Sequence, residues 1–162
     1  MRLFLLLSLY NMHMKLFRPR PILSDGILEL KLVEKHSDSD PDGWGQSWIF
    51  DMIECETHRI VGRCDLRKGE TPTLDLAGHI GYTVYVPYRG HHYAAKACEL
   101  LFNYAVYVGM KKLLITCNTD NAASYRTCEL AGCRFIKTQV VPVTHELYAQ
   151  GDRIKAIFEK IL

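Results

Sequence analysis

The chain has 162 residues, of which 48% are hydrophobic and 23% charged, proportions that are typical of a soluble globular protein. A chain of this length most simply forms one domain. The formal net charge is only +2 and the lysines and arginines are scattered, so the sequence favours neither nucleic acid nor a membrane as a partner.

The cysteines do not form the pattern of a disulfide-rich or zinc-binding protein. Six of them, Cys55, Cys64, Cys98, Cys117, Cys128 and Cys133, are spread through expected strands and helices without a C-x-x-C pair. We therefore expect reduced thiols in a cytoplasmic protein. His91 and His92 are adjacent, so on a helix they point about 100° apart and cannot grip one ion. No metal site is expected.

Residues 1–14 begin with MRLFLLLSLY, which imitates a signal peptide but lacks a cleavage site of small residues. The apolar run is also too short to span a bilayer. We interpret 1–14 as an N-terminal extension from an upstream start codon, followed by one domain over 15–162. If the extension is ordered, its leucines pack either on the domain or on a second copy, so a homodimer is an alternative to a monomer.

The first half of the domain has the pattern of antiparallel strands. Residues 15–25 are an irregular lead-in, and 27–33 alternate between apolar and charged side chains as in a half-buried strand. Residues 47–53 and 59–66 read as the two strands of a hairpin, and 69–77 as a loop.

A strand, a loop and a helix follow over residues 78–109. Residues 79–86 are rich in β-branched and aromatic side chains, and Pro87 then breaks the hydrogen-bonding pattern. From Tyr93 the apolar period changes to that of a helix, which Gly109 is placed to end. The apolar stripe consists of Ala94, Ala97, Leu101, Tyr104 and Val108.

The remaining elements are expected to complete the sheet. Residues 111–117 read as a buried strand parallel to 79–86, because a helix connects them. A turn over 118–121 leads to a helix over 122–131 that Gly132 stops. A strand over 135–141, a connector with a helical turn at 146–149, and a final strand over 153–161 follow, with a short helix as the alternative for the last.

The loop between the central strand and the helix has the features of a phosphate-binding site. It reads Arg89-Gly90-His91-His92-Tyr93-Ala94. The first N–H groups of a helix have no partner within it, and the helix dipole presents a partial positive charge there. An anion such as phosphate is therefore favoured in front of this helix.

Two segments resemble motifs of the GNAT superfamily of N-acetyltransferases. Val84, Arg89, Gly90, His92 and Ala94 are similar to its pyrophosphate loop, with His92 where the family usually has a middle glycine. About 30 residues later comes a segment similar to its Asn-x-x-Ser…Glu-x-x-Gly-Phe pattern, with Cys133 in place of the phenylalanine. This second segment is carried by Asn121, Ser124, Glu129 and Gly132.

The resemblance implies an α/β fold with a mixed sheet, GNAT-like, that lacks the usual helices between its first and second strands. It implies acetyl-CoA as the cofactor. Main-chain groups near Val84 and Val86 would hold the pantetheine arm, and Asn121 and Ser124 would approach it from the other side. The pyrophosphate would lie on the loop formed by Arg89, Gly90, His91, His92, Tyr93 and Ala94.

The implied reaction is transfer of an acetyl group from acetyl-CoA to the primary amine of a small molecule or peptide. Tyr82 and His79 are the catalytic candidates on the central strand. His79 has the intrinsic pKa of a base, although a structural role within the sheet is its alternative. The family's usual thiolate acid, a tyrosine, is replaced by Cys128. A catalytically degraded acyl-CoA-binding or sensing module is therefore the alternative function.

Overall fold

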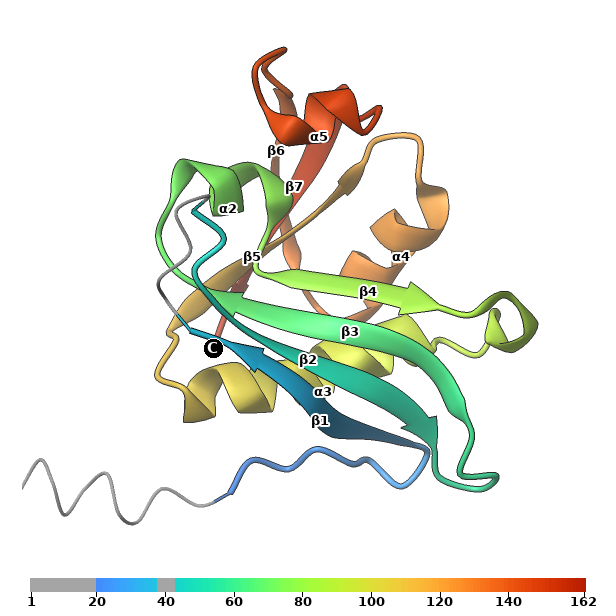
Figure 1. The fold of residues 1–162 in the computed structure, drawn as a ribbon. Helices are drawn as coiled ribbons and strands as arrows, with labels where there is room; N and C mark the ends of the chain where they lie inside the picture. The colour runs from blue at the N-terminus through green and yellow to red at the C-terminus, as the bar shows by residue number, and fades with distance from the viewer. Residues whose placement is uncertain (1–19, 38–42) are drawn as a thin grey trace, which may run out of the picture.

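The computed structural model describes residues 20–37 and 43–162, and the expected N-terminal extension, residues 1–14, lies outside them. Strands and helices alternate after an initial run of strands (Figure 1). In order they are β1 Leu28–His36, β2 Gln46–Glu54, β3 Ile60–Lys68, α2 Pro72–Ala77, β4 Ile80–Val84, η1 Val86–Tyr88, α3 Tyr93–Tyr107, β5 Lys112–Asn118, α4 Ala122–Leu130, β6 Arg134–Val140, α5 Glu146–Ala149 and β7 Ile154–Ile161.

The strands form two antiparallel sheets, one of four strands in the order β1-β2-β3-β4 and one of three in the order β5-β7-β6. The expected hairpin is confirmed, because β2 pairs with β3 in a register that places Phe50 opposite Cys64. The final segment is a strand, β7, and its short-helix alternative is wrong.

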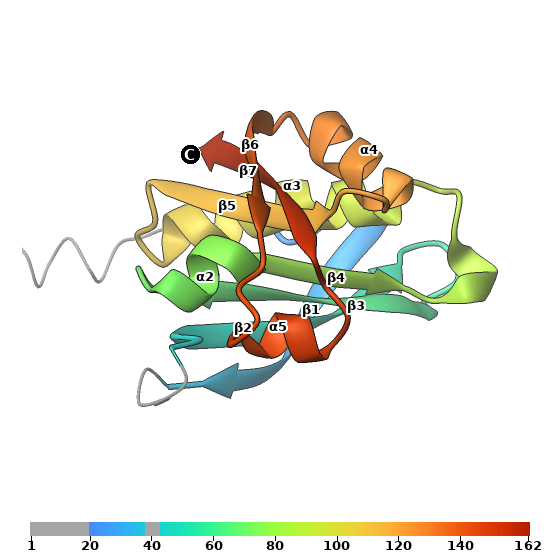
Figure 2. The same ribbon diagram turned by 90° about the horizontal axis from the view of Figure 1, so that it is seen from above.

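Helices α3 and α4 lie together on one side of the sheets, and α2 and α5 lie on the other (Figure 2). The core forms between α3 and the four-stranded sheet, where Phe50, Leu66 and Leu101 are fully buried. Side chains alternate across a strand, so Asp65 and Arg67, which flank Leu66, belong to the opposite face. The expected mixed α/β class is confirmed.

The chain passes from β1 to β2 through residues 37–45, and those of them that the structure describes contain no helix. The four-stranded sheet is consequently covered by α3 on its back, while no described helix lies over its front (Figure 1). This open face agrees with the expectation that helices are missing between the first two strands.

The loop expected over 69–77 is wrong in its second half, which forms α2. Thr71 caps this helix, since its Oγ1 accepts the N–H of Leu74 at 3.2 Å. Pro72 occupies the first helical position, where its missing N–H costs nothing. The helix has six residues, too few to show an apolar period, but Thr71 followed by Pro72 is a helix start signal in the sequence.

The expected parallel pair of strands in one sheet is also wrong, because β4 and β5 belong to different sheets. The strand expected over 79–86 stops at Val84, and Pro87 lies in the short helix η1. The helix that follows is confirmed: α3 starts at Tyr93, and Gly109 takes the left-handed conformation after its end. Among the described residues no helix is long and apolar enough to cross a membrane.

Candidate active site

The site is organised around the separation of β4 from β5, and His79 joins the two strands where the separation begins. Its N–H donates to the carbonyl of Leu114 at 2.7 Å, and its Nδ1 accepts the N–H of Leu114 at 3.0 Å. Its Nε2 lies 3.0 Å from the carbonyl oxygen of Gly69, to which it donates. The imidazole of His79 thus accepts a hydrogen bond from β5 that a main-chain carbonyl would accept in a continuous sheet.

The environment of His79 favours its neutral form. The residue is 9% exposed, and burial lowers the pKa of the imidazole below its ordinary value, against the opposing hydrogen bonds to Gly69 and Leu114. Because Nδ1 is an acceptor and Nε2 a donor, both nitrogens are engaged. The geometry is that of a structural histidine, which was the alternative to a general base.

We expect His79 to make the fold sensitive to mild acid. A histidine with a lowered pKa in the folded state contributes stability that is complete above its unfolded pKa, about 6.5. That stability decreases as the pH falls through the folded pKa, because protonation then favours the unfolded chain. Denaturant unfolding of the parent between pH 7.5 and 5 should show this loss. His79→Gln should show a smaller one, and equal losses would contradict the role.

Beyond His79 the edge of β4 that faces β5 is open. Main-chain hydrogen bonds to β3 come from alternate residues, such as the 2.9 Å bond from the N–H of Tyr85 to the carbonyl of Val61. Val84 is the intervening residue, so its N–H and C=O point toward the side of β5. The side chain of Arg89 lies over this edge, with Nε 3.1 Å from the carbonyl oxygen of Val84.

The loop at the far end of β4 contains two residues in the left-handed region. Gly90 has φ 87° and His92 has φ 59°, so both residues are in the left-handed region. A glycine is favoured at such positions, which explains why a histidine at 92 is unusual. His92 is the N-cap of α3 and makes no capping hydrogen bond through its side chain. The first N–H groups of α3 therefore receive no hydrogen bond from the side chain of His92.

A cluster that the sequence did not suggest supports this loop. The hydroxyl of Tyr93 donates to Glu54 at the end of β2, and this bond raises the pKa of Tyr93 to about 12. Hydrogen bonds from Thr57 and from Tyr93 hold the pKa of Glu54 below its ordinary value. The ring of His91 stacks on Tyr93 with centroids 5.4 Å apart. These contacts attach the start of α3 to the turn between β2 and β3.

The start of α4 forms the other wall of the gap. Asn121 is the N-cap of α4, and its Oδ1 accepts the N–H of Ser124 at 3.0 Å. The hydroxyl of Tyr82 lies 3.4 Å from the carbonyl oxygen of Ser124, so this side chain reaches from β4 to α4. Burial raises the pKa of Tyr82 above its ordinary value, which keeps the hydroxyl protonated and able to donate.

Buried thiols lie beneath Tyr82. Cys128, where the family usually has its tyrosine, is fully buried on α4. Its thiol donates to Cys117 on β5, and this hydrogen bond lowers the pKa of Cys117 and raises that of Cys128. Cys128 therefore keeps its proton in a shielded position. Tyr125 is also removed from the gap, because its ring packs on Phe158 at 4.8 Å between centroids.

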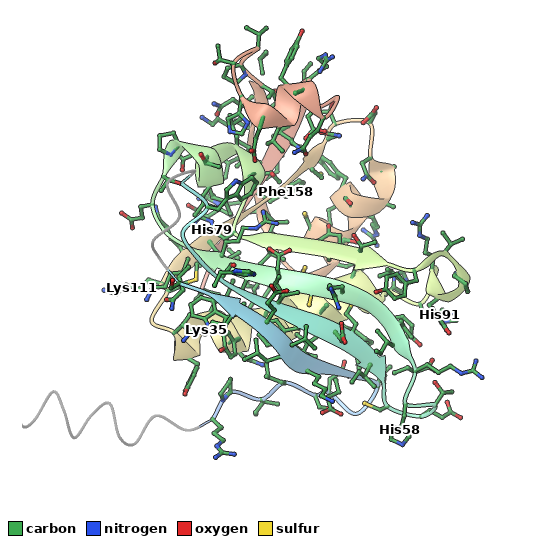
Figure 3. The ribbon with its side chains drawn as sticks, in the orientation of Figure 1. Lys35, His58, His79, His91, Lys111 and Phe158 are labelled. Carbon is green, nitrogen blue, oxygen red and sulfur yellow. The ribbon has the colours of Figure 1, made fainter. Side chains whose placement is uncertain are left out.

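The structure places most of the expected site residues along β4, on the loop that follows it and at the starts of α3 and α4. His79 and His91 lie toward the opposite ends of β4 (Figure 3). Val86, expected to hold the pantetheine arm, lies after the end of β4 in η1 and is 71% exposed. No group of metal-binding side chains occurs among the residues that the structure describes. The other expected residues on these elements and loops are Tyr82, Val84, Arg89, Gly90, His92, Tyr93, Ala94, Asn121 and Ser124.

A family model described as an acetyltransferase (GNAT) domain matches residues 21–134. The acetyltransferase MccE, a microcin C7 self immunity protein solved with acetyl-CoA and AMP, is 18% identical with a TM-score of 0.56, over 72% of this chain and 61% of that chain. A putative ribosomal-protein-serine acetyltransferase from Vibrio cholerae is 21% identical with a TM-score of 0.55, over 72% and 64%.

RimL, an acetyltransferase for the ribosomal protein L7/L12 solved with coenzyme A, is 15% identical with a TM-score of 0.55, over 72% of this chain and 62% of that chain. The chain thus covers less than two thirds of the length of each of these three proteins. At such identities the likeness is one of fold. A comparison with curated proteins found no match.

Proposed function

Since the chain belongs to the GNAT family of acetyltransferases, we propose that it transfers an acetyl group from acetyl-CoA to a primary amine of a small molecule or peptide. The observation that carries the proposal is the gap between β4 and β5, which has an open main-chain edge on one strand and an uncapped helix at its end. Two of the similar structures are complexes with acetyl-CoA or coenzyme A.

The residues of the gap fit the two ends of this ligand. The pyrophosphate would accept hydrogen bonds from the N–H groups between Gly90 and Ala94, where a Cβ on Gly90 would meet no atom within 4 Å. Arg89, His91 and His92 are exposed beside them and add positive charge when protonated. The pantetheine amides would pair with the open edge of β4 near Val84, as an added strand would.

The chain's own groups have distinct roles in the transfer. Acetyl-CoA supplies an activated thioester, and the N–H of Val84 would donate to the oxygen that gains negative charge. Tyr82 presents a protonated hydroxyl between β4 and α4, so we assign it a hydrogen bond toward the sulfur rather than a role as base. We assign His79 a positioning role, because its hydrogen bonds to Leu114 hold β4 and β5 together.

The acceptor and the compartment are parts of the same proposal. Ribosomal-protein acetyltransferases among the similar structures make a peptide amine reasonable beside a small amine. All six cysteines are free thiols, which agrees with a reducing compartment such as the cytoplasm. The alternative, a module that binds acyl-CoA without catalysis, is favoured by one observation: Cys128 is buried and protonated where the family usually has its thiolate acid.

Acetyl-CoA should raise the melting temperature of the protein. At a concentration 100 times its dissociation constant, a ligand that binds the native state alone adds about 2.7 kcal/mol, which corresponds to several degrees for a domain of this size. Thermal unfolding with and without millimolar acetyl-CoA measures this shift. No shift in well-folded protein would contradict both the transferase and the binding module.

Release of free thiol separates the two functions. A transferase should release coenzyme A in proportion to an added amine, whereas a binding module should show the thermal shift without release. The assay is run with a panel of small amines and free peptide N-termini, because the proposal covers both classes of acceptor. Binding without release for every amine would favour the module.

A further inference from the structure

A cavity of about 510 Å³ lies on the open face of the four-stranded sheet, and Trp44, Ile49, Asp65 and Arg67 are among the residues that line it. Cys64 and Leu66 point into the core under α3, so the alternating Asp65 and Arg67 point to the other side of β3. The cavity is therefore separated from α3 by the sheet. In Figure 1 no described helix covers the front of these strands.

The cavity contains a partly desolvated carboxylate. The side chain of Asp65 is 23% exposed, and its Oδ2 lies 2.7 Å from Nε of Arg67. The guanidinium of Arg67 in turn lies over the ring of Trp44, 4.8 Å from its centroid. Burial raises the pKa of Asp65 above its ordinary value, although Arg67 opposes the shift. A carboxylate has lone pairs for more than one donor, so Asp65 can accept a hydrogen bond from a second cation beside Arg67.

Gly81 allows the carboxylate of Asp65 to pack against β4. A Cβ at residue 81 would lie 2.5 Å from Oδ1 of Asp65 and 2.8 Å from Nη2 of Arg67. The absence of a side chain therefore allows the ion pair to rest on the main chain of β4. Gly81 comes two residues after His79, where β4 separates from β5, and three before Val84. At about 3.4 Å per residue, the carboxylate is about 10 Å along the strand from Val84.

We propose that this cavity binds the acceptor as a primary ammonium ion, and that Asp65 is the carboxylate that holds it. This inference rests on the proposed function, because the amine must meet the thioester near Val84. Asp65 is then a catalytic residue that contacts the substrate, and Trp44 with Ile49 contacts the apolar part of the acceptor. Arg67 and Gly81 are positioning residues, since they act through Asp65.

The same contact provides the proton transfer that the reaction requires. The ammonium gives one proton to Asp65, and the neutral amine attacks the thioester carbon with its lone pair. The C–N bond forms as the C–S bond breaks, and the proton left on nitrogen passes to the departing thiolate. Asp65 afterwards releases its proton to water, so the products are the amide, coenzyme A and one proton. A carboxylate with a raised pKa is the better base for this step.

Direct binding of two ammonium probes tests the inference. The probes are n-butylammonium chloride and tetra-alanine amide with a free N-terminus, which represent a small amine and a peptide. Trp44 lines the cavity, whereas Trp48, the other of the two tryptophans, is buried in the core. Tryptophan fluorescence should change saturably with at least one probe, and the tighter probe identifies the acceptor class. Trp44→Phe should remove the signal.

Asp65→Asn should raise the dissociation constant of the bound probe at least tenfold. Asp51→Asn is the matched control, since Asp51 is paired with Arg63 on the neighbouring strand and does not line the cavity. It should change the constant less than twofold. The N-acetylated forms of both probes, which lack the ammonium, should not bind to the parent.

Gly81→Ala gives a second variant that removes no charge. Its methyl group should displace Asp65 and Arg67 and weaken the probe, even if Asp65→Asn fails to fold. Acetyl-CoA affinity, measured by calorimetry, should stay within twofold of the parent in both variants. Unchanged probe binding in Asp65→Asn and Gly81→Ala, or no saturable binding of either probe to the parent, would overturn the inference. If acetyl-CoA still bound, the proposed function would stand.

Discussion

His92→Asp should weaken acetyl-CoA binding at least tenfold, or about 1.4 kcal/mol, without reducing the stability of the free protein. A carboxylate at the N-cap of α3 would occupy the field of the helix N-terminus and repel the pyrophosphate. Acidic residues near a helix N-terminus are otherwise stabilising by about 0.3–1 kcal/mol. Aspartate also tolerates the left-handed conformation, φ 59°, that residue 92 adopts. Calorimetry measures the affinity, and denaturant unfolding measures the stability.

His58→Asp is the matched control for this experiment. His58 is also exposed and has φ 58°, but it lies outside the loop that carries His91, in the turn that follows Glu54 on β2 (Figure 3). It should leave acetyl-CoA affinity within twofold of the parent. His92→Gly should bind at least as well as the parent, because it restores the common family loop. Unchanged affinity in His92→Asp would show that the phosphate lies elsewhere.

Elements with local signals were predictable from the sequence. Gly109 and Gly132 follow the ends of α3 and α4 with positive φ, as glycine after a helix indicates. The helical turn at Glu146–Ala149 and the β2–β3 hairpin were also predictable, because capping and alternation are properties of a few neighbouring residues. The position of the loop over residues 89–94 was also predictable, since the sequence shows a strand, then a proline that ends it, and then a helix.

Features that depend on distant residues were not predictable. The position of β5 in a separate sheet follows from its pairing with β7, about forty residues later in the chain. The contact of Tyr93 with Glu54 joins positions that are 39 residues apart. The place of Asp65 beside Gly81 depends on the register of β3 against β4. Such registers leave no local signal in the sequence.

The wall of the gap that carries Asn121 depends on a nearly buried ion pair. Lys155 on β7 and Asp152 lie 2.6 Å apart between Nζ and Oδ2, with side chains 10% and 16% exposed. Asn118, at the end of β5, donates from Nδ2 to Oδ1 of Asp152 at 2.7 Å. Burial raises the pKa of Asp152, but hydrogen bonds from Lys155 and Asn118 outweigh it and lower the pKa below 3.8. The contacts of Asp152 with Lys155 and Asn118 therefore fix the turn that leads from β5 into α4.

Asp152→Asn should cost about 3 kcal/mol of unfolding free energy, because it leaves the charge of Lys155 buried without a partner. The new side chain still offers an oxygen to Asn118, so the change isolates the lost charge. Asp152→Asn/Lys155→Met should recover most of the loss, since neither charge then remains. Denaturant unfolding of the parent, both single variants and the double variant gives the coupling.

The pH dependence provides the independent check on this pair. A carboxyl group with a lowered pKa contributes stability that is present above about 3.9, its unfolded value, and lost as the pH falls through the folded pKa. The parent should therefore lose stability below about pH 4 more steeply than Asp152→Asn, which has no such group. If the parent and Asp152→Asn lose stability with the same slope, or if the double variant is no more stable than Asp152→Asn, the ion pair does not stabilise this turn. Acetyl-CoA affinity should fall with the single variant and return with the double one, because Asn121 follows directly on the turn that Asn118 begins.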